Sequence, residues 1–123
     1  MNLNWYGLFD PLEKEKIRNE TTSQAGIYLL MVQLQDNKWG TLYVGQADNI
    51  QEELVDQLSV EESDAYDCIK ENRLNYPCGF LFAPLDGQRE RDRVQKYLYD
   101  YLEPECNSED PGGASTRVNL PDI

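Results

Sequence analysis

Two runs of strand-forming residues separated by a short polar turn constrain this chain more than any other feature. Residues 26–34 (Gly-Ile-Tyr-Leu-Leu-Met-Val-Gln-Leu) are rich in β-branched, aromatic and aliphatic side chains, and the polar residues 36–38 (Asp-Asn-Lys) follow them. Residues 39–44 form a second run of the same kind. Two strand signals joined by such a turn predict a β-hairpin.

The rest of the chain alternates helical and strand signals. Asp48 or Asn49 can cap a helix that extends to Leu58. The other expected elements are a short helix at 11–18, a helix at 63–72, a third strand at 77–83 and a helix at 88–102. Apolar residues at 94, 97, 98, 101 and 102 make the last helix the strongest helical signal. The order predicts an α/β chain of the α+β type, with a small three-stranded antiparallel sheet flanked by helices.

The length of 123 residues fits one domain. We expect residues 1–24 to be an N-terminal extension packed on the domain, residues 25–107 to be the domain, and residues 108–123 to be a polar tail. That tail is small and polar, so we expect it to be mobile unless Val118 and Leu120 dock.

The net charge of −12 bears most directly on function. No Lys or Arg lies between Lys38 and Lys70, and that gap holds eight acidic residues: Asp48, Glu52, Glu53, Asp56, Glu61, Glu62, Asp64 and Asp67. Because nucleic-acid binding depends on cations that neutralise phosphates, this charge disfavours direct binding of duplex DNA. It is consistent with a solvated acidic face or with a basic protein partner.

The cysteines and the apolar runs predict the redox state and location. Three cysteines with no C-x-x-C pair indicate neither a disulfide framework nor a zinc site, so we expect reduced, partly buried thiols. The longest apolar run, residues 27–32, is far shorter than a membrane span, and the first residues do not resemble a signal peptide. We therefore expect a cytoplasmic protein with no membrane association. The absence of histidine excludes imidazole catalysis and His–metal ligation.

Two tripeptides on the expected hairpin carry a family resemblance. Residues 26–28 are Gly-Ile-Tyr, residues 43–45 are Tyr-Val-Gly, and Gln-Ala-Asp-Asn-Ile follows at 46–50. At the far end, residues 97–107 (Tyr-Leu-Tyr-Asp-Tyr-Leu-Glu-Pro-Glu-Cys-Asn) resemble a closing helix followed by Pro and Asn. Together these segments resemble the GIY-YIG nuclease family over about residues 25–107, and the resemblance implies that family's fold.

The resemblance implies a metal-dependent phosphodiesterase site, which needs an oriented water, a cation and a metal to stabilise developing charge. It would use Tyr28 as a proton-relay tyrosine, Tyr43 as its partner and Asn107 as a closing amide. The resemblance also places Gly26 and Gly45 close to the site as tight backbone positions. An alternative role for Tyr28 and Tyr43 is that of half-buried strand tyrosines, and for Asn107 that of a helix-exit cap.

Two charged residues of the family are replaced. The family arginine, ten residues beyond the second-motif tyrosine, corresponds to Glu53, and the family glutamate, nine residues before the closing proline, corresponds to Gln95. An acid at the first position repels phosphate, and an amide at the second is a weak ligand for Mg²⁺ or Mn²⁺. Because loss of one stabilising group costs roughly 100- to 1000-fold in rate, we expect an inactive pseudoenzyme. Gln95 can equally be an ordinary polar helix residue.

Three functions stay open. The favoured hypothesis is a non-catalytic module on a nuclease-like scaffold that binds a protein, possibly a basic one, and needs no cofactor. A DNA-associated alternative is an endonuclease that uses Mg²⁺ or Mn²⁺ at Asp92, with Arg89 and Arg93 contacting phosphate. These two arginines alternate with acids, so a salt-bridged helix start is the competing interpretation. In the third hypothesis, the acidic stretch imitates nucleic acid and inhibits a nucleic-acid-binding protein. The sequence is compatible with a monomer or a homodimer formed through the Tyr-rich last helix.

Overall fold

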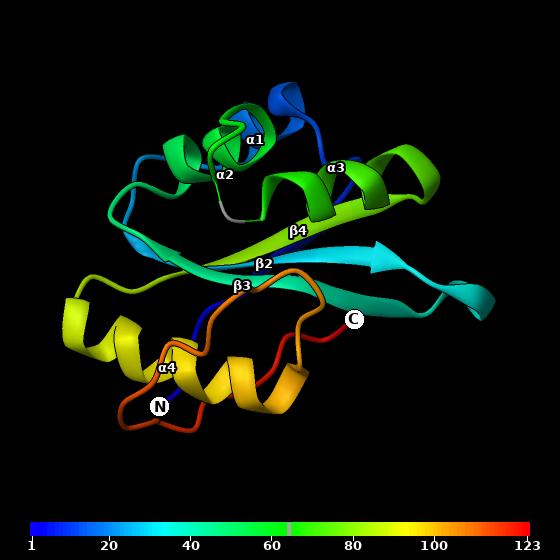
Figure 1. Ribbon diagram of the computed structural model, residues 1–123. Coiled ribbons are helices and arrows are strands. Elements are labelled where there is room, and N and C mark those ends of the chain that lie inside the picture. The colour runs from blue at the N-terminus through cyan, green and yellow to red at the C-terminus, as the bar shows by residue number, and fades with distance from the viewer. Residues whose placement is uncertain (64) are drawn as a thin grey trace.

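The computed structural model describes residues 1–63 and 65–123, and their fold is of the α+β class. A four-stranded antiparallel sheet in the order β1-β4-β2-β3 carries helices on both faces (Figure 1). The strands are β1 (Tyr6–Phe9), β2 (Gly26–Gln33), β3 (Trp39–Ala47) and β4 (Cys78–Pro84). The helices are α1 (Lys14–Glu20), α2 (Ile50–Ser59), α3 (Tyr66–Asn75) and α4 (Gln88–Leu102), with a 3₁₀ turn η1 (Gln35–Asn37).

The expectation of three strands was wrong, because β1 adds a fourth strand beside β4. Tyr6 pairs with Phe82 and Phe9 pairs with Phe80. The ring of Tyr6 also stacks on that of Phe82, with 5.3 Å between centroids. A strand of four residues with a glycine inside lacks the alternation that marks a strand in sequence, so cross-strand aromatic contacts define it instead.

The predicted hairpin is present as β2 and β3. Its register pairs Tyr28 with Gly45 and Leu30 with Tyr43. The chain turns at η1, where Asp36 and Asn37 take left-handed backbone angles with φ of 63° and 60°. Asp and Asn tolerate this conformation better than most residues, which explains the polar turn in the sequence.

The helices follow their sequence signals with shifted ends. Asn49 caps α2, because its side chain accepts a hydrogen bond from the Glu52 backbone N–H at 3.0 Å. Helix α3 begins at Tyr66 rather than at Ser63. The expected start includes Asp64, which lies outside the described residues. Helix α4 spans the predicted residues 88–102.

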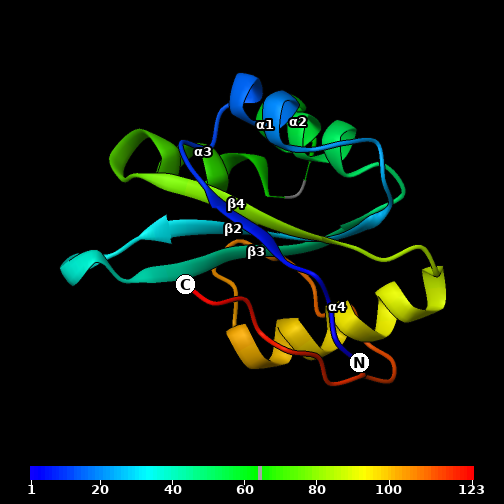
Figure 2. The same cartoon turned by 180° about the vertical axis from the view of Figure 1, so that it is seen from behind.

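Strand β2 is buried on both faces and divides the core in two. Tyr28, Leu30 and Val32 pack with apolar residues of α1, α2 and α3 on one face. Ile27, Leu29 and Met31 pack toward α4 and both terminal segments on the other. Figures 1 and 2 show the same division, with α1–α3 on one side of the sheet and α4 on the other.

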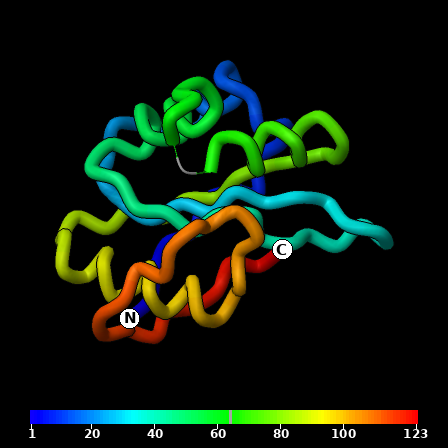
Figure 3. The backbone as a smooth tube through the Cα atoms, in the orientation of Figure 1, coloured from blue at the N-terminus to red at the C-terminus, as the bar shows by residue number. Residues whose placement is uncertain are grey.

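The two terminal segments hold each other against the α4 face. The Asn119 side chain accepts from Leu3 N at 2.6 Å and donates to Leu3 O at 3.0 Å. Val118 is buried, so this residue docks as the sequence allowed, whereas Leu120 is 37% exposed. Figure 3 shows the C-terminal segment running along α4. No helix among the described residues is long and apolar enough to cross a membrane.

Candidate functional site

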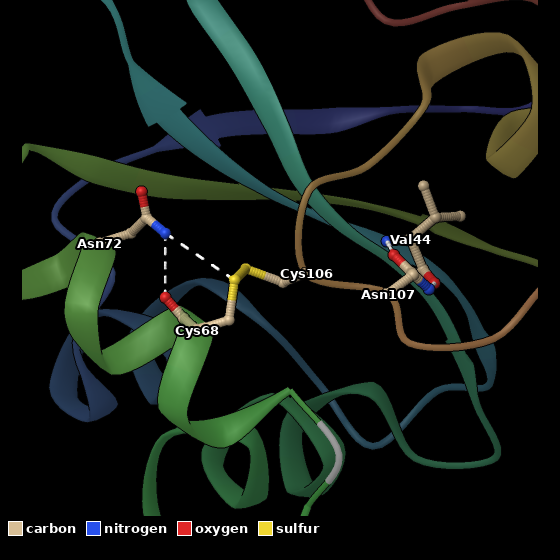
Figure 4. The surroundings of a disulfide bond; sticks show 5 residues. All are labelled: Val44, Cys68, Asn72, Cys106 and Asn107. Atoms are coloured by element: carbon tan, nitrogen blue, oxygen red, sulfur yellow. Dashed lines mark hydrogen bonds between the residues drawn. A yellow bond between two sulfur atoms is a disulfide. The ribbon is translucent and has the colours of Figure 1, made fainter.

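The segment after α4 covers the outer edge of β3, which is an edge strand of the sheet. Glu105 N donates to Thr41 O at 3.2 Å, and Cys106 N donates to Leu42 O at 2.6 Å. The side chain of Asn107 then bonds both backbone groups of Val44, accepting from N at 2.9 Å and donating to O at 3.0 Å (Figure 4). Asn107 therefore acts on the backbone of β3, and both ends of its amide are engaged.

Tyr28 and Tyr43 lie together at the same end of the hairpin. Their rings stack with centroids 5.9 Å apart. The Tyr28 ring also crosses Gly45 so closely that a Cβ there would lie 2.2 Å from it, which explains the glycine at that position. Gly26 is similarly confined, since a Cβ would lie 2.3 Å from the Ala83 carbonyl oxygen.

Tyr28 is sealed in the core and keeps its proton. Its side chain is 1% exposed, and its hydroxyl oxygen accepts a hydrogen bond from Gln57 Nε2 at 3.0 Å. Burial raises the pKa of Tyr28 well above the usual tyrosine value, and the neighbouring Tyr43 and Glu53 raise it further. A phenol with a raised pKa and almost no contact with water is a poor proton relay.

Glu53 brings negative charge to the helix facing Tyr28. Its pKa is raised, first by partial burial and then by the nearby carboxylates of Asp56 and Glu52. Asn49, Glu52 and Glu53 occupy the cap and first turn of α2, where the helix dipole favours acids. The acidic residues of this turn therefore suit the start of the helix, and Glu53 offers no cation to a phosphate.

Gln95 reaches β3 from the opposite face of the sheet. Its Nε2 donates to Val44 O at 3.3 Å, and its Oε1 accepts from Gln46 Nε2 at 3.0 Å. The same Gln46 nitrogen donates to Asp92 Oδ1 at 2.6 Å, and Gln88 Nε2 donates to that oxygen at 2.8 Å. These hydrogen bonds lower the pKa of Asp92.

This donor set does not fit a divalent metal. The Gln95 oxygen and one Asp92 oxygen are already bound by amide N–H groups, whereas Mg²⁺ requires several free oxygen ligands in octahedral geometry. Within residues 1–63 and 65–123, no group of three or more His, Cys, Asp or Glu side chains could hold a metal ion. We therefore derive no metal-dependent step.

Tyr43, Gln95 and Asn107 line one cavity of about 370 Å³, and residues 108–111 form its other wall. The predicted tyrosine, metal-ligand and amide positions therefore meet at the β3 edge. Glu53 lies near Tyr28 on the α2 side. Asp92 lines the neighbouring cavity with Gln95, Gly112 and Gly113. Arg89 is exposed and Arg93 half-buried on α4, and neither lines these two cavities.

Lys96 anchors the loop at residues 108–111, which forms one wall of the cavity. Lys96 Nζ lies 3.0 Å from the Asp110 carboxylate and 2.9 Å from Asp100. The two carboxylates raise the pKa of Lys96. Asp110 also accepts from Gly112 N at 2.7 Å, which closes the turn. The loop therefore covers one side of the cavity.

Arg91, which the sequence analysis did not single out, joins the hydrogen-bond network of Gln46 and Gln88. It is 2% exposed, and its guanidinium bonds Asp48 Oδ1 at 2.7 Å and Gln88 Oε1 at 2.9 Å. It also donates to Gln46 Oε1 at 3.2 Å and to the carbonyl oxygens of residues 85 and 86. Its spacing from Val94 and Leu98, three and seven residues on, was the available signal for a buried position.

The cysteine expectation was wrong for two of the three residues. Cys68 of α3 and Cys106 form a disulfide with Cα atoms 5.6 Å apart, and Cys78 is free and buried (Figure 4). The two cysteines have a sequence separation of 38, and only the fold brings them together. No local spacing of cysteines in the sequence therefore predicts this disulfide. The bond fixes the residue before Asn107 to α3.

Comparisons with protein-family models, with curated proteins and with solved structures find nothing that matches this chain.

Proposed function

We propose that this chain is a catalytically inactive binding module on a GIY-YIG-like scaffold and that its partner is a protein. The observation that carries the proposal is the state of Gln95 and Asn107. Both amides lie at positions of the proposed site, and both bond the backbone of Val44. Their polar atoms hold the sheet edge together instead of meeting a phosphate.

Charge and burial support the same proposal. Tyr28 is shielded from solvent, and Glu53 places a carboxylate where the resemblance calls for an arginine. The net charge of −12 opposes a nucleic-acid substrate and favours a partner with basic surface. A chain with these properties needs no cofactor, and either a monomer or a homodimer is compatible with it.

Incubation with supercoiled plasmid, single-stranded and duplex oligonucleotides in Mg²⁺ or Mn²⁺ tests the loss of catalysis. We expect no cleavage above that of the buffer. The double variant Glu53→Arg/Gln95→Glu restores both family residue types and serves as the matched comparison. Cleavage by the wild type that Tyr28→Phe abolishes would sink the proposal.

The nuclease with relocated ligands makes a separate prediction at Asp92. It requires Mg²⁺ or Mn²⁺ to bind there, so calorimetry should give heat that Asp92→Asn removes. The hydrogen bonds from Gln46 and Gln88 to Asp92 argue against this alternative.

The acidic α2 region supports a second candidate, inhibition of a basic nucleic-acid-binding protein. Glu52 and Asp56 are exposed, and neither forms a salt bridge among the residues described. Affinity for such a partner should fall steeply with salt, since exposed charges are screened within about 8–10 Å. Binding that is indifferent to salt would remove this candidate.

We propose the cytoplasm as the location, and the Cys68–Cys106 bond gives a way to test it. Cytosolic thiols are generally kept reduced. Acid quenching of whole cells, followed by alkylation in denaturant and a mass count of blocked cysteines, measures the state directly. Three blocked thiols would agree with the cytoplasm, and one would indicate an oxidising compartment.

A further inference from the structure

A groove on the face opposite α4 departs from the acidic character of the chain. It has a volume of about 380 Å³ and lies between the residues before α1, helix α3 and the start of β4. Its lining includes Lys70 and Arg73 but a single acidic side chain, Glu13. The groove is therefore locally basic in a chain of net charge −12.

The two cations are available to a ligand. Neither Lys70 nor Arg73 forms a salt bridge with any described residue. Lys70 Nζ lies 5.8 Å from the centre of the Tyr66 ring, which holds the ammonium group over the lining. Because exposed charges beyond about 8–10 Å are screened at physiological salt, the charges of the lining itself, Lys70, Arg73 and Glu13, act most directly on a bound ligand.

Apolar residues make up most of the remaining lining, and several of them are exposed. Leu74 is 76% exposed, the highest value among the large hydrophobic side chains described, and Tyr76 is 56% exposed. Pro11 and Pro77 stand on the two sides. Tyrosine and arginine are enriched in protein-binding hot spots, and exposed apolar patches mark sites of protein interaction.

The thiol of the groove is poorly suited to nucleophilic chemistry. Its one thiol, Cys78, is buried, and burial raises the pKa of that thiol to about 11, although Arg73 acts in the opposite direction. A thiol with this pKa is protonated at neutral pH and is a weak nucleophile.

We propose that the α3 groove docks a short acidic peptide segment of a partner protein, in which carboxylates meet Lys70 and Arg73 and an apolar side chain packs on Leu74 and Tyr76. This inference rests on the proposed function, since it assigns the surface through which the module binds. The occupant is a short peptide rather than a nucleic acid because two cations beside one acidic residue can neutralise a short acidic segment but not a run of phosphates, which the net charge of −12 repels.

Short immobilised peptide pools test the proposal with the full chain. Each pool carries two fixed residues flanking a position randomised among Leu, Ile, Phe and Tyr, and the fixed residues are Glu, Gln or Lys. We expect the wild type to bind the Glu pool roughly tenfold more tightly than the Gln pool. Lys70→Glu/Arg73→Glu should reverse the preference toward the Lys pool, and Leu74→Ser should weaken binding to every pool.

The matched control is Lys38→Glu/Arg117→Glu, which makes the same change in net charge at exposed positions outside the groove. It should behave as the wild type does. Equal weakening by both double variants, binding of no pool, or a single-stranded oligonucleotide that outcompetes the Glu pool at Lys70 and Arg73 would each overturn the inference. Circular dichroism checks that the variants fold. The cleavage assay is independent of the peptide pools. A negative result with the pools would leave the proposed loss of catalysis unaffected, and cleavage of nucleic acid would leave the peptide-binding result unaffected.

Discussion

The side-chain amide of Asn107 forms two hydrogen bonds with the backbone of Val44, one through its oxygen at 2.9 Å and one through its nitrogen at 3.0 Å. The pairing imitates a neighbouring strand at a single residue. The sequence resemblance assigns Asn107 to a catalytic site, whereas in the structure its side chain stabilises the edge of β3.

Asn107→Asp tests that task. A carboxylate can still accept from Val44 N, but it cannot donate to Val44 O and is repelled by that oxygen. We expect unfolding free energy to fall by about 1–3 kcal/mol, measured by urea denaturation. Asn119→Asp is the matched comparison, because Asn119 forms the same pair of bonds with Leu3. A change below about 0.5 kcal/mol in Asn107→Asp would show that the pairing contributes little.

Because the buried hydroxyl of Tyr28 is bonded to Gln57, mutations of these two residues should have non-additive effects on the free energy of unfolding. Tyr28→Phe leaves Gln57 Nε2 without its acceptor, and Gln57 Oε1 already has no hydrogen-bond partner among the residues that the structure describes. The single variant should lose about 1–3 kcal/mol of stability, while Tyr28→Phe/Gln57→Met should recover part of the loss because both polar groups are then removed. Additive losses in a double-mutant cycle would contradict this coupling.

Replacement of Glu53 by Gln should increase the free energy of unfolding in a pH-dependent way. Burial and Asp56 raise the pKa of Glu53 in the folded state, so this carboxyl ionises in the unfolded chain at a lower pH than in the folded one. The free energy of unfolding therefore falls as the pH rises from the unfolded pKa through the folded pKa. Glu53→Gln should therefore stabilise the fold at pH 7, by about 0.2–0.5 kcal/mol for the Asp56 repulsion alone. The gain should vanish below the ordinary pKa of 4.5, where both states are protonated.

Thermal or urea unfolding across this pH range measures the effect. Glu71→Gln, an exposed change on α3, controls for the general reduction in negative charge. A larger gain in the control than in Glu53→Gln would assign the effect to net charge rather than to the α2 site.

The disulfide predicts a large difference between oxidised and reduced protein. For the sequence separation of 38 between Cys68 and Cys106, the chain-entropy model gives a stabilisation of about 4 kcal/mol. The urea midpoint should therefore fall on addition of dithiothreitol. The fall should persist in Cys78→Ala and disappear in Cys68→Ser/Cys106→Ser, and a midpoint indifferent to reductant in the wild type would refute the bond.

Local signals predicted the hairpin and α4. The hairpin was predicted because two runs of strand-forming residues flank a polar turn, and α4 because apolar residues recur at helical spacing. Strand β1 was missed because four residues carry too short a pattern. Arg91 was missed because a charged side chain within an apolar stripe is normally assigned to solvent, whereas five protein groups bond this one.

The candidate site divides in the same way. The family resemblance singled out Tyr28, Tyr43, Gln95 and Asn107, and three of these line one cavity. The roles of Gln46 and of the loop anchored by Lys96 depend on contacts between distant segments, which no spacing rule carries. The family itself stays a prediction, as do the roles assigned from it.

Residues 105–107 also cover a strand edge that would otherwise be open to other chains. A free strand edge is a template on which another chain can add its own strand, and this addition can propagate into aggregates. Here the chain occupies its own β3 edge from Thr41 to Val44, while the opposite edge strand, β1, is only four residues long. Residues 105–107 therefore also protect the β3 edge from the addition of a strand by another chain. A variant in which this segment leaves the edge should assemble through β3 before it unfolds.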